Sequence, residues 1–291
     1  MLFDSLSTKL NLIRVQAPLF IPAGTGFQDI RLSENNKMAQ INFQYFQLPG
    51  VHLEIFHSLA KRRRQILSLH EFEPYSGIYA EGHFMRVIEP EVTPTHSFLK
   101  QVEENLAKRY PNQIDRQLPE NISFIHSQEL EEQFPGITPK DREVAITKEL
   151  GAVFLIGIGH PLPQSGQPHS KRNSDYDDWW TQSNSIGYRG LNGDILVWDS
   201  TLDTVLEISS MGIRVSSESL EQQSIIQGTW EYIKELDYHK SIAGEKFVYS
   251  IGGGIGIDRV LKCILRKRHI GDIQVGVWPE EELNAHYEYL R

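Results

Sequence analysis

Two carboxylates, Asp194 and Glu207, have a spacing that suits the binding of a metal ion. Each belongs to a short apolar segment typical of a β-strand, residues 193–199 and residues 204–215. The turn-forming residues 199–203 separate the two segments. The sequence therefore predicts a β-hairpin with one acid on each strand.

The register of this hairpin decides whether the two acids meet. Pairing Asp199 with Thr204 across the turn places Ser209 opposite Asp194. Asp194 and Glu207 are then diagonal neighbours on one face, about 7 to 8 Å apart at Cα. At this distance their carboxylates can bind one divalent cation. The alternative is a polar outer face of an antiparallel sheet that is exposed to solvent.

A basic cluster near residue 60 holds one arginine in an unusual position. Val51–Ile55 alternates as a strand, and Ser58 can cap a helix that begins at Leu59. Arg63 falls on the apolar stripe of this helix, where a guanidinium needs an anion from a ligand or, alternatively, from an internal ion pair. The other basic residues of the cluster are expected on a solvated helix face: Lys61, Arg62 and Arg64.

Glycines precede the last predicted helix. Residues 246–250 have the pattern of a strand, and the glycine-rich stretch that follows predicts a turn into a helix. Such a turn lets a phosphate approach the backbone at the helix start, and Arg259 lies one turn further on. The spacing matches neither the dinucleotide fingerprint G-x-G-x-x-G nor the P-loop. The candidate nucleotide-binding glycines are Gly254 and Gly256.

Composition narrows the class of protein. The chain has 291 residues, of which 40% are hydrophobic, and its formal net charge of -9 disfavours a dedicated nucleic-acid binder. Its single cysteine, Cys263, excludes an internal disulfide and a cysteine-rich metal site. No segment reaches the roughly 20 apolar residues that span a bilayer, and the N-terminus lacks the pattern of a signal peptide. We expect a cytoplasmic protein without a membrane partner.

A single domain, residues 1–291, is the simplest organisation, because no linker, repeat or long charge block divides the sequence. The densest group of turn-forming residues lies at 160–192, after a predicted strand at 152–158. It predicts a long surface loop, and long loops in compact domains usually have a function.

The sequence resembles the ammonia-dependent asparagine synthetases, which are aspartate–ammonia ligases built on the catalytic fold of class II aminoacyl-tRNA synthetases. The matching stretches follow the family's order across nearly the whole chain, which makes the set specific although each stretch alone is weak. They are IRVQAP at 13–18 with Gln28 and Asp29, HSLAK at 57–61, HSQEL at 126–130, LGAVFL at 150–155, DYDDW at 175–179, LNGDILVW at 191–198, SSMGIR at 209–214, GGGIGIDR at 252–259, and HIG to VWP at 269–279.

The resemblance implies an α+β fold, with an antiparallel sheet flanked by helices, and a homodimer that binds ATP. Arg86 and Arg259 match the two arginines that carry the nucleotide chemistry. Fixed cations there stabilise the charge that builds on the phosphates when a carboxylate attacks. Asp194 and Glu207 match the family's Mg2+-binding acids, which favours the metal interpretation of the hairpin.

The resemblance also implies an amino-acid pocket. Arg63 stands where the family has a lysine, and Arg214 matches the family's arginine, so the two are expected to clamp the carboxylate that does not react. Asp29 and Asp177 match acids that face the substrate or the incoming ammonia. Ser210, within SSMGIR, is assigned to the same pocket.

If Glu207 and Arg214 serve one pocket, the predicted strand at 204–215 must be irregular. Regular alternation places Arg214 on the face opposite Glu207, seven residues earlier. A shared site therefore predicts a β-bulge within residues 209–212, where Gly212 favours one.

The sequence departs from the family between His96 and His126. The family has there a tryptophan-rich strand, whose Gln and Asp side chains hold the substrate's amino group, and then a longer insert. Here Phe98, Val102 and Leu106 recur at four-residue intervals and predict a helix, after a loop at 90–97. The contacts to the amino group, and with them the identity of the acid and the amine, stay open.

The leading hypothesis is an ATP-dependent amide ligase. Aspartate or an aspartate-like acid forms an acyl-adenylate, and ammonia or a small amine then displaces AMP. A second hypothesis is an inactive paralogue that binds a metabolite or a partner and regulates, which predicts loss of the phosphate arginines or metal acids. A third is a tRNA synthetase, and the -9 charge and the absence of residues for an anticodon-binding domain count against it.

Overall fold

The structure is a computed structural model that describes residues 12–14, 20–22, 46–48, 51–55, 61, 64, 65, 68, 77–81, 86–88, 92–111, 117–274, 280 and 281. The strands are β1 Leu12–Arg14, β2 Phe20–Pro22, β3 Phe46–Leu48, β4 Val51–Ile55, β5 Gly77–Glu81, β6 Arg86–Ile88, β7 Ser123–His126, β8 Ala152–Ile156, β9 Asn192–Asp199, β10 Thr204–Ile213 and β11 Ile251–Ile255. The helices are α4 Val92–Arg109, α5 Ser127–Gln133, α6 Pro139–Leu150, α7 Ser217–Ile226, α8 Trp230–Ile233, α9 Asp237–Ala243 and α10 Ile257–Ile264, with a 3-10 turn at Ile270–Asp272.

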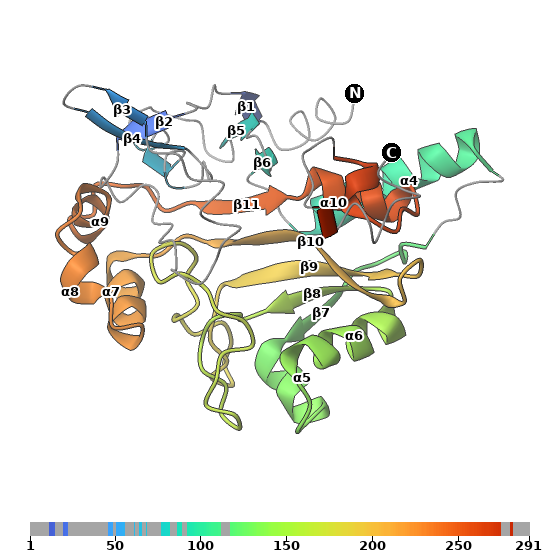
Figure 1. Cartoon of the computed structure of the whole chain (residues 1–291). Helices are drawn as coiled ribbons and strands as arrows, with labels where there is room; N and C mark the ends of the chain where they lie inside the picture. Colours follow the sequence, from blue (N-terminus) through green and yellow to red (C-terminus); the bar gives the residue numbers. More distant parts are fainter. Residues whose placement is uncertain are drawn as a thin grey trace.

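A large mixed sheet organises the molecule, in the strand order β1-β5-β6-β11-β10-β9-β8-β7 (Figure 1). The five pairings from β5 to β8 are antiparallel, whereas the outer pairs β1–β5 and β7–β8 are parallel. A second sheet, β2-β4-β3, is antiparallel. The predicted α+β architecture is confirmed, and so is the predicted strand Val51–Ile55.

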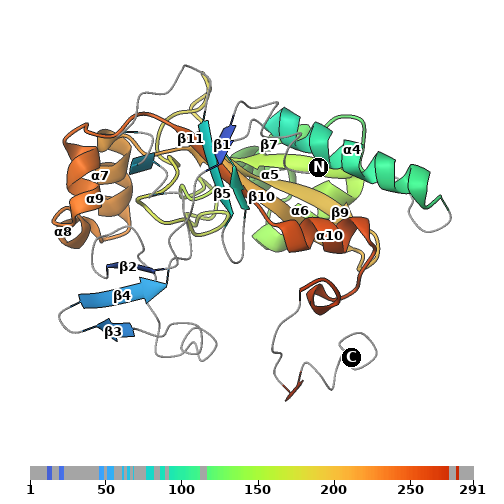
Figure 2. The same ribbon diagram turned by 90° about the horizontal axis from the view of Figure 1, so that it is seen from above.

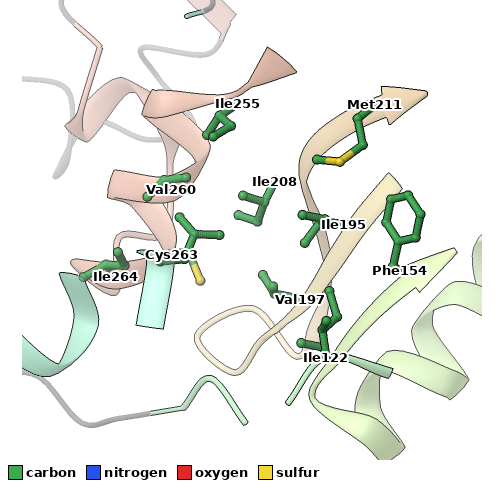
Figure 3. Close-up of a cluster of buried hydrophobic side chains, with 12 residues drawn as sticks. Ile122, Phe154, Ile195, Val197, Ile208, Met211, Ile255, Val260, Cys263 and Ile264 are labelled. Carbon is green, nitrogen blue, oxygen red and sulfur yellow. The ribbon is translucent and has the colours of Figure 1, made fainter. Parts of the chain in front are cut away.

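Alternating side chains of strands β7 to β11 bury both faces of this part of the large sheet. On one face, residues of β8, β9, β10 and β11 pack against α10 and α4 (Figures 2 and 3). Within this core, burial raises the pKa of the Cys263 thiol to about 11, as expected for a structural rather than a nucleophilic cysteine. On the other face, Leu155, Leu196 and Val205 pack against α5 and α6.

The hairpin β9–β10 has the predicted register, with Asp199 opposite Thr204 and Leu196 opposite Glu207. Asp199 anchors the turn, because its buried carboxylate accepts from Thr201 N at 3.0 Å and from Lys262 Nζ at 2.8 Å. Beyond Glu207 the register shifts by one residue.

Two predicted segments are wrong. The strand predicted at 246–250 is instead β11, Ile251–Ile255, so the glycines form the strand rather than a turn after it. Backbone pairing with β10 on one side and β6 on the other holds this chain extended despite its glycines. The loop predicted at 90–97 is also wrong from Val92 onward, where α4 begins.

Helices α7, α8 and α9 form a separate layer beyond the end of β10 (Figures 1 and 2). Their core comprises Val215, Leu220, Ile233, Tyr238 and Ile242. Helix α7 also reaches the long loop before β9, because the Gln223 amide oxygen accepts from Trp179 N at 2.6 Å and from Trp180 N at 3.0 Å. The helical layer therefore fixes the loop at Trp179 and Trp180.

The predicted loop at 160–192 is confirmed, because between β8 and β9 the chain has only isolated bridges. It is nonetheless well anchored. The Glu131 carboxylate accepts from Gln164 N at 3.1 Å and Ser165 N at 3.2 Å, and Asp178 accepts from Thr181 N at 2.8 Å. Within the described part of the chain, no helix combines the length and the hydropathy needed to cross a bilayer.

Candidate active site

A β-bulge determines which side chains of β10 share a face. The register shifts between Glu207 and Ser209, so Asp194 of β9 faces Ser210 instead of the predicted Ser209. Glu207, Ser210 and Arg214 consequently lie on one face. The predicted bulge is therefore confirmed in its effect, although it lies before Ser209 rather than within residues 209–212.

Asp194 is a buried carboxylate with 4% of its surface exposed. Its Oδ2 contacts Nη2 of Arg172, a residue of the long loop, in a close ion pair. Its Oδ1 is buried without a hydrogen-bond partner. Burial raises the pKa of Asp194, Arg172 lowers it in part, and the negative charge of Glu207 raises it again, to about 6.

Glu207 connects this acid to the helix that carries the predicted phosphate arginine. Arg259 Nη1 lies 3.2 Å from Glu207 Oε1 and also donates to the Glu207 backbone oxygen at 3.0 Å. Both side chains are roughly half exposed, at 49% and 40%. The structure therefore brings together Asp194, Glu207 and Arg259, three of the residues selected from the sequence.

Arg214 and Asp177 form a buried ion pair, with 4% of each side chain exposed. Burial raises the pKa of Asp177, and Arg214 counteracts this only in part. The guanidinium also lies over the Tyr176 ring, 4.2 Å from its centroid. A Cβ on Gly252 would lie 2.6 Å from Arg214 Cζ, so the glycine of β11 is what gives the guanidinium its space.

The two candidate nucleotide-binding glycines lie beside this face. Gly254 of β11 is opposite Ser210 of β10. Gly256 is the N-cap of α10, and a Cβ there would lie 3.3 Å from Arg259 Cδ. Arg86 is in β6, with its Cα opposite Ile255. Asp29 and Arg63 lie outside the described residues.

The prediction that Lys61 and Arg64 lie on a solvated helix face is wrong. Both side chains are buried, with 6% and 3% of their surface exposed. Arg64 donates to the Val215 backbone oxygen at 2.7 Å, and Lys61 Nζ lies 2.5 Å from Asp175 Oδ2. The basic cluster is therefore an internal anchor for the β10 end and the loop. The prediction failed because the carboxylate and the carbonyl that accept from these side chains lie more than 100 residues away in the sequence.

Asp175 is the centre of a buried charge cluster that the sequence analysis missed. Its Oδ2 accepts from Lys61 and lies 2.7 Å from His239 Nε2 of α9, a residue without exposed surface. Burial raises the pKa of Asp175, but Lys61 and His239 outweigh it and lower the pKa to about 2. The acidic stretch DYDDW was the available signal, because a buried acid requires a cation.

The Asp175 cluster predicts a loss of stability in acid. The folded pKa lies below the unfolded value of about 3.9, so the stabilisation of about 2 kcal/mol is present above pH 4 and lost as the pH falls towards 2. The free energy of unfolding, measured in urea at several pH values, should differ between the wild type and Asp175→Asn near pH 6. The difference should shrink between pH 4 and pH 2, and a difference independent of pH contradicts the assignment.

The carboxylate oxygens of Asp194 and Glu207 suit the binding of a magnesium ion that is shared with a nucleotide. Among the residues that the structure describes, no group of three or more His, Cys, Asp or Glu side chains forms a metal cage. Magnesium with substrate phosphates needs only one or two carboxylates, and Asp194 Oδ1 is a buried acceptor without a donor. Asp194 and Glu207 would hold the ion.

Solved structures place the fold in a class. The asparaginyl-tRNA synthetase of Pyrococcus horikoshii complexed with asparaginyl-adenylate matches with a TM-score of 0.61 at 12% identity, over 93% of this chain and 64% of that one. The Entamoeba histolytica asparaginyl-tRNA synthetase gives 0.59 at 11% identity, over 92% and 63%. The aspartyl-tRNA synthetase of the same organism gives 0.55 at 12% identity, over 94% and 55%. The chain therefore has the catalytic fold of class II aminoacyl-tRNA synthetases and spans less than two thirds of each of these proteins.

The match to a protein family is more specific than the similarity of fold. A family model described as aspartate-ammonia ligase matches residues 1–100 and 83–289, which is most of the chain. The chain belongs to this family of ligases. The resemblance found in the sequence is thereby confirmed.

Proposed function

We propose that the protein is an ATP-dependent amide ligase that activates the side-chain carboxylate of aspartate, or of an aspartate-like acid, as an acyl-adenylate. Ammonia or a small amine then displaces AMP and leaves the amide. The observation that carries the proposal is the position of Glu207, which contacts the phosphate arginine Arg259 while its charge acts on the buried acid Asp194. Cationic and metal-binding groups thus adjoin on one face of the sheet.

Adenylation explains why such a site needs fixed cations. A carboxylate is a poor electrophile at neutral pH, and AMP makes a competent leaving group. When the acid attacks the α-phosphate, negative charge builds on the phosphoryl oxygens, which Arg259 and Arg86 would stabilise. A bound magnesium ion would neutralise the remaining phosphate charge.

The acid would lie further along the same face. Arg214 and Arg63 would bind the carboxylate that does not react, and Ser210, whose Cα is opposite that of Asp194, would contribute a hydroxyl. Asp29 and Asp177 would face the amino group or the incoming ammonia. Arg214 is already paired with Asp177, which supports a preformed pocket because a paired guanidinium is fixed before the substrate arrives.

The remaining assignments belong to the same proposal. A single catalytic domain over residues 1–291 is supported by a sheet that takes strands from β1 to β11. A homodimer is supported by the edge strand β7, whose Phe124 is 54% exposed. The -9 charge supports small-molecule substrates without tRNA or other nucleic acid. A cytoplasmic setting without a membrane partner is part of the same proposal.

Pyrophosphate exchange tests the proposal directly. Labelled pyrophosphate, ATP and magnesium are supplied with carboxylic acids one at a time, and incorporation of label into ATP is measured. Exchange that depends on aspartate or one of its analogues supports the ligase and identifies the acid. Absence of exchange with every acid contradicts it and favours the inactive regulatory paralogue. Amide formation with ammonia and other amines then identifies the second substrate.

A further inference from the structure

Arg172 is a cation at the site that the family resemblance did not select. It lies in the long loop before β9, where Gln227, the C-cap residue of α7, donates a side-chain hydrogen bond to its backbone oxygen. Its side chain is 23% exposed and its Nη2 contacts Asp194 Oδ2. The guanidinium therefore occupies a position next to a carboxylate that is proposed to bind magnesium.

The Arg172–Asp194 pair leaves both partners incompletely satisfied. Arg172 Nε is buried without an acceptor, and Asp194 Oδ1 is buried without a donor. Each such group forfeits the hydrogen bond that water would have given it. Asp194 Oδ1 is therefore a buried acceptor directly beside the guanidinium, in a position where a cation could bind the same carboxylate.

Arg172 also lies near the amino-acid pocket. Its charge lowers the pKa of Asp177 as well as that of Asp194, so the guanidinium acts on both acids. A divalent cation on Asp194 and a guanidinium on the same carboxylate would repel each other at close range. Each of the two cations therefore weakens the binding of the other to Asp194.

We infer that Arg172 neutralises Asp194 in the free protein and is displaced from it when magnesium enters with the nucleotide. The inference rests on the proposed function, because it assigns an order of binding to that site. Magnesium alone must displace Arg172 without offering it another anion. Magnesium with ATP supplies phosphate oxygens to which the released guanidinium can donate. The cation therefore binds weakly alone and tightly with the nucleotide.

Manganese titration without nucleotide tests the inference. The free Mn2+ signal is followed by electron paramagnetic resonance at pH 8.5, where Asp194 is ionised, for the wild type and Arg172→Met. Removal of the competing cation should tighten Mn2+ binding about tenfold or more. Arg268→Met, which removes an exposed arginine elsewhere on the chain, should leave the affinity unchanged. Unchanged or weaker binding by Arg172→Met overturns the inference.

Two further variants keep the test decisive. Arg172→Met combined with Asp194→Asn should lose the gain, because the gain must come from the released carboxylate. A gain that survives this second change also overturns the inference. If Arg172→Met does not fold, as judged by circular dichroism, Arg172→Gln removes the same charge and serves in its place.

The proposed function is checked separately. Calorimetric titration of the wild type with magnesium and a non-hydrolysable ATP analogue measures nucleotide binding itself. If the analogue does not bind, the ligase proposal fails whatever Arg172 does. If it binds and Arg172→Met leaves nucleotide-free Mn2+ binding unchanged, only the displacement of Arg172 is wrong.

Discussion

Arg259→Ala is expected to lower acid-dependent pyrophosphate exchange by about 10²- to 10³-fold, because it removes a fixed cation from the site where phosphate charge develops. The protein should remain folded. Arg259 and its partner Glu207 are both substantially exposed, and ion pairs of that kind contribute about 0 to 1 kcal/mol to stability. The loss should fall on the exchange rate at saturating acid, with the urea midpoint nearly unchanged.

Two companion variants separate charge from geometry at Arg259. Arg259→Lys retains a cation without the planar fork, so it should recover part of the rate and not all of it. Arg268→Ala removes an exposed arginine of the same C-terminal part of the chain and should leave exchange at the wild-type level. Wild-type exchange by Arg259→Ala would show that this side chain does not contact the nucleotide.

The local parts of the site were predictable from the sequence. The hairpin register follows from strands and a turn that are adjacent in the chain, and Asp199 was correctly placed opposite Thr204. The bulge was predicted because regular strand alternation places Glu207 and Arg214 on opposite faces, whereas the family resemblance implies one shared site. Its position was not fixed, because either side of Ser209 resolves the same conflict.

The long-range parts of the site were not predictable. Lys61 and Arg64 have the composition of a solvated basic run, and nothing nearby in the sequence reveals that Asp175 and the Val215 carbonyl receive them. Arg172 was missed for the same reason. Its partner is 22 residues away across an irregular loop, where no periodicity assigns a side chain to a face.

The glycines of β11 show a different limit. A run of glycines has low strand propensity, so the pattern favoured a turn before a helix. What the pattern does not contain is the need for space at Gly252, where the Arg214 guanidinium lies against the strand. Backbone pairing with β10 and β6 overrides the local preference, and the contact with Arg214 explains why a glycine is needed at position 252.

Replacement of Arg214 is the substitution expected to cost most stability. In Arg214→Leu the Asp177 carboxylate stays buried without its cation, and breaking such a pair from one side costs about 3 to 5 kcal/mol. The loss of the contact with Tyr176 adds to this cost. Urea unfolding monitored by tryptophan fluorescence should show the decrease as a lower midpoint with a similar slope.

A second substitution distinguishes this structural role from the proposed contact with the substrate. Asp177→Leu combined with Arg214→Leu removes the unpaired charge, so most of the lost stability should return, because an apolar pair of similar volume can replace a buried ion pair. Acid-dependent exchange should not return, since the double variant lacks two of the side chains proposed to contact the substrate, the Arg214 guanidinium and the Asp177 carboxylate. Recovery of exchange together with stability would mean that Arg214 supports the fold and does not contact the acid. Exchange that stays absent in a stable double variant would show that the Arg214–Asp177 pair serves the substrate as well as the fold.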